Sequence, residues 1–307
     1  MTLTVHLLYM KKSRKGSVNN MYAIKTEELT KFYGKSRGIE NVNLSIEEGD
    51  FFGFIGPNGA GKSTTIRTLL GLITKTSGKA EIFGKDISEN KTDLLGQIGY
   101  LPSETAFYGN MKVKDMISLS ANLRGVNCSD EAKKLSDRLD LDTERRVSEL
   151  SLGNRKKVGI VCALQHKPSL YILDEPTSGL DPLMQREFYS ILKERNDEGA
   201  TIFLSSHILA EVSRYCKRAA VIREGRVIAS DSIERLGHTG VKRISLKSAS
   251  PLPDIDGVRD VVTSGESVSF LYSGDAKSLL QKLCTLDFTD INISDPDLDE
   301  IFMHYYM

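Results

Sequence analysis

Residues 56–63, GPNGAGKS, constrain the fold of this chain more than any other feature, because they match the pattern GxxxxGK[ST] of a phosphate-binding loop. An apolar run at 51–55 precedes them and a helical pattern at 62–72 follows, which is the context that such a loop requires. Glycines let backbone N–H groups wrap phosphate oxygens at the N-terminus of a helix. We expect Lys62 to neutralise the β- and γ-phosphates and Ser63 to ligate Mg²⁺. The residues predicted to bind the nucleotide are Gly56, Pro57, Asn58, Gly59, Ala60, Gly61, Lys62, Ser63 and Thr64.

Two adjacent carboxylates, Asp174 and Glu175, follow the apolar run at 170–173. Neighbouring residues at the end of a strand point in different directions, so the two acids can have different roles. Asp174 can hold Mg²⁺ through its water shell, and Glu175 can polarise the water that attacks the γ-phosphate. Alone, such a pair is more often a solvated loop or a helix cap. After a phosphate-binding loop, it predicts hydrolysis of the nucleotide.

Short apolar runs alternate with helical patterns from Ala23 to about Ser230, which predicts an α/β domain with a largely parallel sheet. Helical periodicity replaces the strands over about 103–165, so we expect a helical insertion there, with helices at 113–123 and 130–139. Asp181 and Pro182 open another helix that ends near Gly199. Further strands are predicted at 80–83, 98–101, 170–173 and 201–204, the last two buried on both faces.

The character of the sequence changes after Gly237. Strands are predicted at 243–247 and 267–272, and helices at 276–283 and 298–306. We therefore divide the chain into an extension at 1–20, an α/β domain at 21–237 and a small α+β domain at 238–307. Because the first domain begins directly after Met21, Met21 is our hypothesis for the native start.

Composition excludes several classes of function. Basic and acidic residues both number 41, and the first twenty residues hold four basic and no acidic side chains, so the remainder is negative and nucleic acid is not expected as a partner. The longest apolar stretches, such as 158–164, fall far short of the roughly 20 residues of a spanning helix. The cysteines lack CxxC spacing, which favours a reducing, cytoplasmic compartment. They are Cys128, Cys162, Cys216 and Cys284.

From Tyr33 to His207, more than half of the chain, these motifs stand in the order of an ATP-binding cassette (ABC) ATPase, which the sequence resembles. The resemblance implies the ABC nucleotide-binding fold, with an antiparallel β edge formed by the N-terminal strands. It implies that His207 contacts the γ-phosphate and orients Glu175, and that Tyr33 stacks on adenine, although an aromatic there could equally pack. Residues 178–181, SGLD, match the family loop that ends in Asp181 and acts on the ATP of the opposite subunit.

The sequence departs from the family pattern at two places. The signature LSGGQ is LSLGN at 150–154, where Ser151 and Gly153 remain to bind ATP across a dimer, while Leu152 and Asn154 alter the geometry or timing of closure. The basic residues 155–157 can be a solvated face. Ser103 and Glu104 stand where the family has a glutamine that touches Mg²⁺. The Ser103 hydroxyl, a bridging water or Glu104 could supply that contact.

The resemblance implies a subunit that binds ATP and Mg²⁺, closes head-to-tail as a homodimer or a heterodimer of cassettes, and drives a separate permease at the cytoplasmic face of the membrane. The sequence at 297–302 resembles the C-terminal segment found in the ATP subunits of bacterial exporters of drugs, lipids or peptides. Two alternatives stay open. One is a soluble, non-transport ABC ATPase acting on ribosomes or DNA, and the other is a regulatory ATP binder with low turnover.

Overall fold

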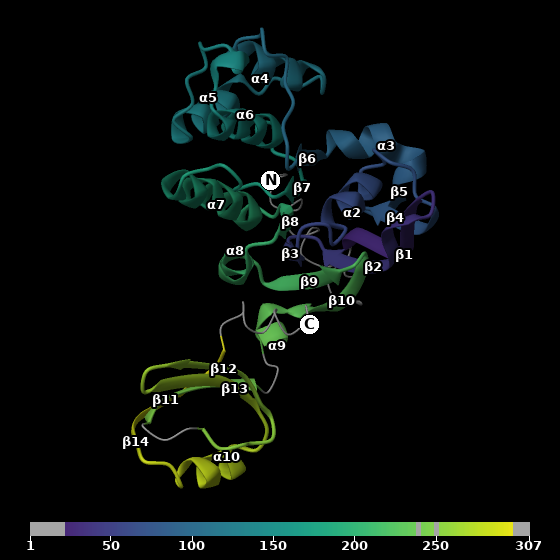
Figure 1. Cartoon of the computed structure of the whole chain (residues 1–307). Helices are drawn as coiled ribbons and strands as arrows, with labels where there is room; N and C mark the ends of the chain where they lie inside the picture. Colours follow the sequence, from purple (N-terminus) through teal and green to yellow (C-terminus); the bar gives the residue numbers. More distant parts are fainter. Residues whose placement is uncertain (1–21, 238–240, 249–251, 297–307) are drawn as a thin grey trace, which may run out of the picture.

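The computed structural model describes residues 22–237, 241–248 and 252–296 of the chain (Figure 1). The predicted extension at 1–20, the hypothetical start at Met21 and the predicted helix at 298–306 lie outside the described residues. Within the part that is described, no helix combines the length and the apolar character needed to cross a membrane.

A six-stranded sheet of order β10-β9-β3-β8-β7-β6 forms the centre of the larger unit. Neighbouring strands from β9 to β6 are parallel, and only β10 at the edge runs antiparallel to its neighbour β9. Every residue of β3, β7 and β8 is buried, as expected where both faces of a parallel sheet are covered. This confirms the predicted parallel core. The strands are β3 (Phe51–Ile55), β6 (Ile98–Leu101), β7 (Leu170–Asp174), β8 (Thr201–Ser206), β9 (Arg218–Arg223) and β10 (Arg226–Ser232).

A second, antiparallel sheet of order β2-β1-β4-β5 covers one side of the central sheet, as predicted for the N-terminal strands. Its residues Ile24 and Ile39 share an apolar core with Phe52 and Phe54 of β3 and with Ile66 of α2. The strands are β1 (Tyr22–Tyr33), β2 (Ser36–Glu47), β4 (Ser77–Ile82) and β5 (Lys85–Asp86), and the helices on this side are α2 (Lys62–Leu69) and α3 (Ile87–Gly96).

Helix α2 is shorter than the predicted 62–72. The Leu72 N–H turns back to the Arg67 carbonyl at 2.9 Å, and Gly71 N–H bonds the Thr68 carbonyl at 3.0 Å. These bonds satisfy the last carbonyls of the helix and close it before residue 72.

The other side of the central sheet is covered by helices, including the predicted helical insertion (Figure 1). Phe51 and Leu173 of the sheet share a core there with Ile117, Leu135 and Val158 from three insertion helices. The predicted helices at 113–123 and 130–139 are confirmed within a residue at either end, and the helix opened by Asp181 ends two residues before Gly199. These elements are α4 (Val113–Asn122), α5 (Ser129–Arg138), the short η1 (Val147–Glu149), α6 (Leu152–Leu164), α7 (Pro182–Asp197), α8 (Leu209–Tyr215) and α9 (Ile233–Gly237).

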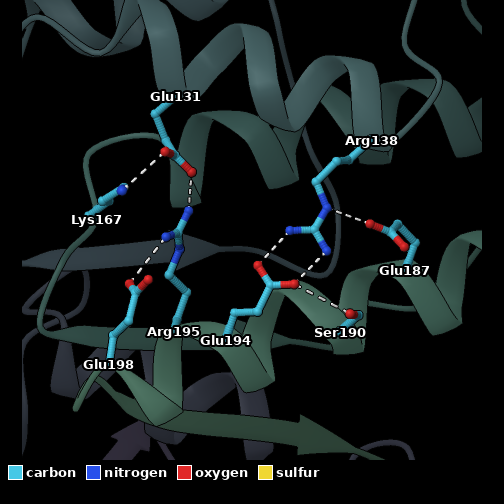
Figure 2. A network of polar contacts seen from close by, with 8 residues as sticks. All are labelled: Glu131, Arg138, Lys167, Glu187, Ser190, Glu194, Arg195 and Glu198. Carbon is cyan, nitrogen blue, oxygen red and sulfur yellow. Dashed lines mark hydrogen bonds and ion pairs between the residues drawn. The ribbon is translucent and has the colours of Figure 1, made fainter.

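An ion-pair network joins α5 of the insertion to α7 (Figure 2). Arg138 donates to Glu187 at 2.5 Å and forms a bidentate pair with Glu194 at 2.6 and 2.8 Å. The Glu194 and Glu187 carboxylates raise the pKa of Arg138. The buried Arg195, which directly follows Glu194, pairs with Glu131, which lies about two turns before Arg138 in α5. Two arginines and their carboxylates therefore fix the insertion to α7.

We expect Arg138→Gln to lower the free energy of unfolding by about 1 kcal/mol, because a bidentate, partly buried ion pair contributes more to stability than the usual surface ion pair. The loss should shrink in molar salt, which screens the exposed edge of the network. Urea unfolding at low and high salt measures both effects. The exposed Arg186 of α7 provides the matched control, Arg186→Gln, and equal losses for the two variants would contradict the assignment.

The partly buried imidazole of His166 follows α6, and its Nε2 lies 3.3 Å from the Ile98 carbonyl of β6. Burial, together with the Arg124 charge, lowers the pKa of His166 from 6.5 to about 4. As pH falls through this window, the unfolded chain binds a proton that the folded chain does not, so stability is lost.

We expect His166→Gln to remove this dependence. The stability of the parent protein relative to the variant should fall as pH drops from about 6.5 to about 4, and should be constant above that window. Denaturant unfolding at several pH values tests this expectation. A difference that is the same at both ends of the window would show that His166 does not titrate as described.

A smaller unit follows, with the sheet order β12-β13-β11-β14 and one helix. Ile244, Leu246, Phe270, Leu279 and Leu283 belong to its own apolar core. The predicted strands at 243–247 and 267–272 and the helix at 276–283 are confirmed. Strand β12 was not predicted because it is almost wholly exposed and has no alternating apolar face. The elements are β11 (Val241–Ser248), β12 (Val258–Ser264), β13 (Ser267–Ser273), α10 (Ala276–Leu283) and β14 (Phe288–Ser294).

Candidate active site

The phosphate-binding loop connects the end of β3 to the start of α2, as the sequence predicts. Gly61 caps α2 with φ of 109°, and a Cβ at this position would lie 2.9 Å from Ile39. A larger residue would therefore be strained and would press on the core below the loop. Ser63 and Thr64 stand in the first turn of α2, where free backbone N–H groups and the helix dipole favour an anion.

The Lys62 side chain folds back onto the phosphate-binding loop to which it belongs. This side chain is 6% exposed, and the ammonium donates to the Gly56 carbonyl at 2.6 Å and to the Pro57 carbonyl at 3.2 Å. It also lies 3.1 Å from Oε1 of Glu175. The structure therefore joins the phosphate-binding loop to the carboxylate that the sequence selects as the base.

Glu175 lies between Lys62 and His207. Its Oε2 is 2.6 Å from Nδ1 of His207, which follows β8. Its backbone has φ of 48°, an uncommon conformation for a residue with a side chain, and its N–H bonds the Ser205 carbonyl at 3.1 Å. Strained positions that the surrounding structure enforces are typical of functional sites. The His207 side chain is 47% exposed, so the far nitrogen of its ring is accessible to a ligand.

Asp174, directly before Glu175 in the chain, is almost completely buried, at 1% exposed. Its Oδ1 accepts a hydrogen bond of 2.5 Å from the Ser205 hydroxyl. Its Oδ2 is buried and has no hydrogen-bond partner among the described residues. An unpaired carboxylate oxygen of this kind is costly unless a cation or a metal-bound water satisfies it. The donor set of Asp174 and Ser63 therefore fits Mg²⁺.

Ser205 was missed by the sequence analysis. It is a fully buried hydroxyl in the apolar strand β8, directly opposite Asp174 of β7. A polar residue inside a strand that is buried on both faces was the available signal, because such a group must find a partner.

The structure does not gather every predicted residue at the loop. Tyr33, at the end of β1 and 48% exposed, does lie near the loop, because a Cβ at Gly38 would be 2.9 Å from Cε2 of Tyr33 and 3.1 Å from Cγ2 of Thr64. The Lys31 ammonium lies 5.2 Å from the Tyr33 ring centroid. Ser151 is the N-cap of α6 and accepts from Asn154 N–H at 3.3 Å, next to the exposed Leu152. Among the described contacts, none joins Ser151, Gly153 or Asp181 to the loop.

Asp181 has a structural role that its predicted function did not include. It is the N-cap of α7, and its Oδ1 accepts from the N–H groups of Leu183 and Met184 at 3.0 Å each. Both of these bonds go to Oδ1, so the cap uses only one of the two carboxylate oxygens, and the residue is exposed. The cap orients the start of α7 beside the 178–181 loop.

A solvated basic face, the plain alternative for residues 155–157, is wrong for Lys156 and Lys157, which are 3% and 8% exposed. The Lys156 ammonium donates to the carbonyls of Pro102 and Ser103 at 3.2 and 3.0 Å. Burial lowers the pKa of Lys156 to about 8, while the Asp174 and Glu175 carboxylates oppose that fall. Lys156 is therefore a buried lysine close enough to Asp174 and Glu175 to feel their charge.

The comparisons with known proteins agree with this geometry. A family model described as ABC transporter matches residues 39–178. The chain is 41% identical over 220 residues to the bacitracin transport ATP-binding protein BcrA of Bacillus licheniformis, covering 69% of this chain and 71% of that one. It is 27% identical to the linearmycin resistance ATP-binding protein LnrL of Bacillus subtilis, covering 92% and 97%.

Among solved structures, the ATP-binding subunit of an ABC transporter aligns with a TM-score of 0.67 and 30% identity, over 70% of this chain and 91% of that one. This subunit has the same fold as the larger unit described above. The matching family model, the identity to a transport ATP-binding protein and the arrangement around the phosphate-binding loop lead to one conclusion: the chain belongs to the ABC transporter family, as an ATP-binding subunit with ATPase function.

Proposed function

We propose that this chain hydrolyses Mg-ATP to power a separate membrane permease that exports drugs, lipids or peptides. The observation that carries the hydrolytic part is the position of Glu175, which lies between Lys62 of the phosphate-binding loop and His207. Regulatory binding with low turnover does not require a strained carboxylate at this place. The exporter part is supported by the names of two relatives, one a bacitracin transport protein and the other a linearmycin resistance protein.

In this proposal, the loop N–H groups and Lys62 bind the β- and γ-phosphates, and Tyr33 stacks on adenine. Ser63 and Asp174 would hold Mg²⁺, with Ser103 or Glu104 near the glutamine position, and the bound ion would neutralise phosphate charge. Glu175 orients the attacking water and takes its proton, while His207 holds Glu175 in place and reaches the γ-phosphate. Of these groups, Lys62, Glu175 and His207 form one cluster at the loop, and the Tyr33 ring lies near Thr64.

Two copies, or this chain and a related cassette, would close head-to-tail, so that Ser151, Gly153 and Asp181 of one subunit meet the ATP of the other. All three stand at or next to the N-terminus of a helix, which favours the negative charge of phosphate. We further propose that residues 238–307 form an accessory domain and that the subunit works at the cytoplasmic face, attached through its permease.

Purification of the tagged chain from detergent-solubilised membranes of its native cells tests the transport role. We expect a multi-spanning membrane protein to co-purify, and ATP hydrolysis by the complex to rise with the transported compound. A chain that instead stays on ribosomes in high salt would support the non-transport alternative and overturn the proposal.

A further inference from the structure

Lys156 connects the signature helix to the segment that replaces the family glutamine. It lies in the second turn of α6, whose N-cap is Ser151, and its buried ammonium donates to the backbone carbonyls of Pro102 and Ser103. A buried ammonium is stable only where hydrogen bonds or opposite charges compensate for lost water. The two carbonyls supply those bonds, so the lysine and the Ser103 backbone hold each other in place.

The same face of α6 fits closely against the rest of this segment. Gly159 is three residues after Lys156 and therefore on the same face of the helix. A Cβ at Gly159 would lie 2.7 Å from Cγ2 of Thr105 and 2.9 Å from Cδ1 of Leu101. The segment 101–105 is thus seated on α6 at two successive turns, by hydrogen bonds at Lys156 and by close packing at Gly159.

The segment leads from β6 toward the carboxylates of the neighbouring strand β7. Leu101, the last residue of β6, pairs with Leu173, the residue before Asp174. Asp174 and Glu175 are also the two carboxylates whose charge acts on Lys156. Lys156 therefore stands beside the proposed Mg²⁺ site without touching either carboxylate in the described contacts.

We propose that Lys156 is a positioning residue that fixes Ser103 for the Mg²⁺-bound nucleotide and ties that position to the signature end of α6. Ser103 has a shorter side chain than the glutamine of the family, so it has less reach to compensate for a displaced backbone. Loss of Lys156 frees the Ser103 backbone, and the Mg²⁺-dependent part of nucleotide binding weakens. This inference rests on the proposed roles of Ser63, Asp174 and Ser103.

Lys157 provides a matched control, because it is the adjacent lysine on the same helix and is also buried. Its ammonium lies 3.5 Å from the Asp140 carbonyl, at the end of α5, and not at the Ser103 segment. A general cost of removing a buried lysine from α6 should appear in both variants. An effect on Mg²⁺ should appear only at Lys156.

The test uses the full chain carrying Glu175→Gln, in which hydrolysis is suppressed, and fluorescent mant-ATP titrated at increasing Mg²⁺ from an EDTA baseline. We expect Lys156→Met to raise the Mg²⁺ concentration for half-maximal tightening by about tenfold, as is usual when a group supporting a metal site is lost. Affinity in EDTA should be unchanged. Lys156→Arg, which keeps the charge and the donors, should restore most of the Mg²⁺ response, and Lys157→Met should match the parent.

Where Lys156→Met does not fold, as judged by circular dichroism, Lys156→Gln retains one donor and should show a smaller rise in the same direction. An unchanged Mg²⁺ response in the folded Lys156 variant, or equal changes for Lys156→Met and Lys157→Met, would overturn the inference alone. Failure of the parent to bind mant-ATP would instead refute the proposed function, and this inference with it.

Discussion

Glu175→Gln is expected to reduce ATP turnover by about 10²- to 10⁴-fold, the usual contribution of a general base. Glutamine has nearly the same shape, and its amide oxygen can accept from Lys62, but it cannot take a proton from water. ATP affinity should therefore stay within a few-fold of the parent. Phosphate release under saturating Mg-ATP measures turnover, and mant-ATP titration measures affinity.

The exposed Glu89 of α3 supplies the control for this substitution. Glu89→Gln makes the same chemical change away from the site, and its turnover should equal that of the parent. If Glu175→Gln retains full turnover, Glu175 is not the base, and the assignment of hydrolysis to the Lys62, Glu175 and His207 cluster is wrong.

Lys62→Met is expected to weaken ATP binding by at least about 30-fold, because removing one partner of a buried charged contact costs about 2–5 kcal/mol. The Lys62 side chain is 6% exposed and its ammonium is held by the Gly56 carbonyl, so it is positioned before any phosphate arrives. Methionine fills a similar volume but leaves the phosphate charge uncompensated. Isothermal titration calorimetry with ATP measures the loss.

Lys91→Met separates this effect from the general cost of removing a lysine. Lys91 also donates to a glycine carbonyl, that of Gly71 at 2.7 Å, but belongs to α3 outside the phosphate-binding loop. We expect its ATP affinity to equal that of the parent. Equal affinities for Lys62→Met and the parent would falsify the phosphate-binding role of Lys62.

The sequence predicted those features that depend on neighbours along the chain. The strands β7 and β8 were predictable because burial on both faces requires an unbroken apolar run. The phosphate-binding loop and the pair Asp174 and Glu175 were predictable because each motif is contiguous. The partners of these residues were not, since Ser205 meets Asp174 only through the pairing of two strands far apart in sequence.

Lys156 shows why the remainder could not be predicted. Three consecutive basic residues on a helix are usually exposed, and nothing local distinguishes Lys156 from Arg155. Its burial depends on the segment after β6 lying across α6, which is a tertiary arrangement. Strand β12 was missed for the opposite reason, because its exposure removes the apolar alternation by which a strand is recognised.

The ion pairs between α5 and α7 also determine which parts of the subunit can travel together. Helix α7 begins at its N-cap Asp181, and further along it Glu187, Glu194 and Arg195 pair with α5. While those pairs persist, the insertion cannot turn about the central sheet without taking the start of α7 with it. In the proposed closed dimer, Ser151 and Asp181 would therefore approach the ATP of the other subunit as one rigid unit rather than independently.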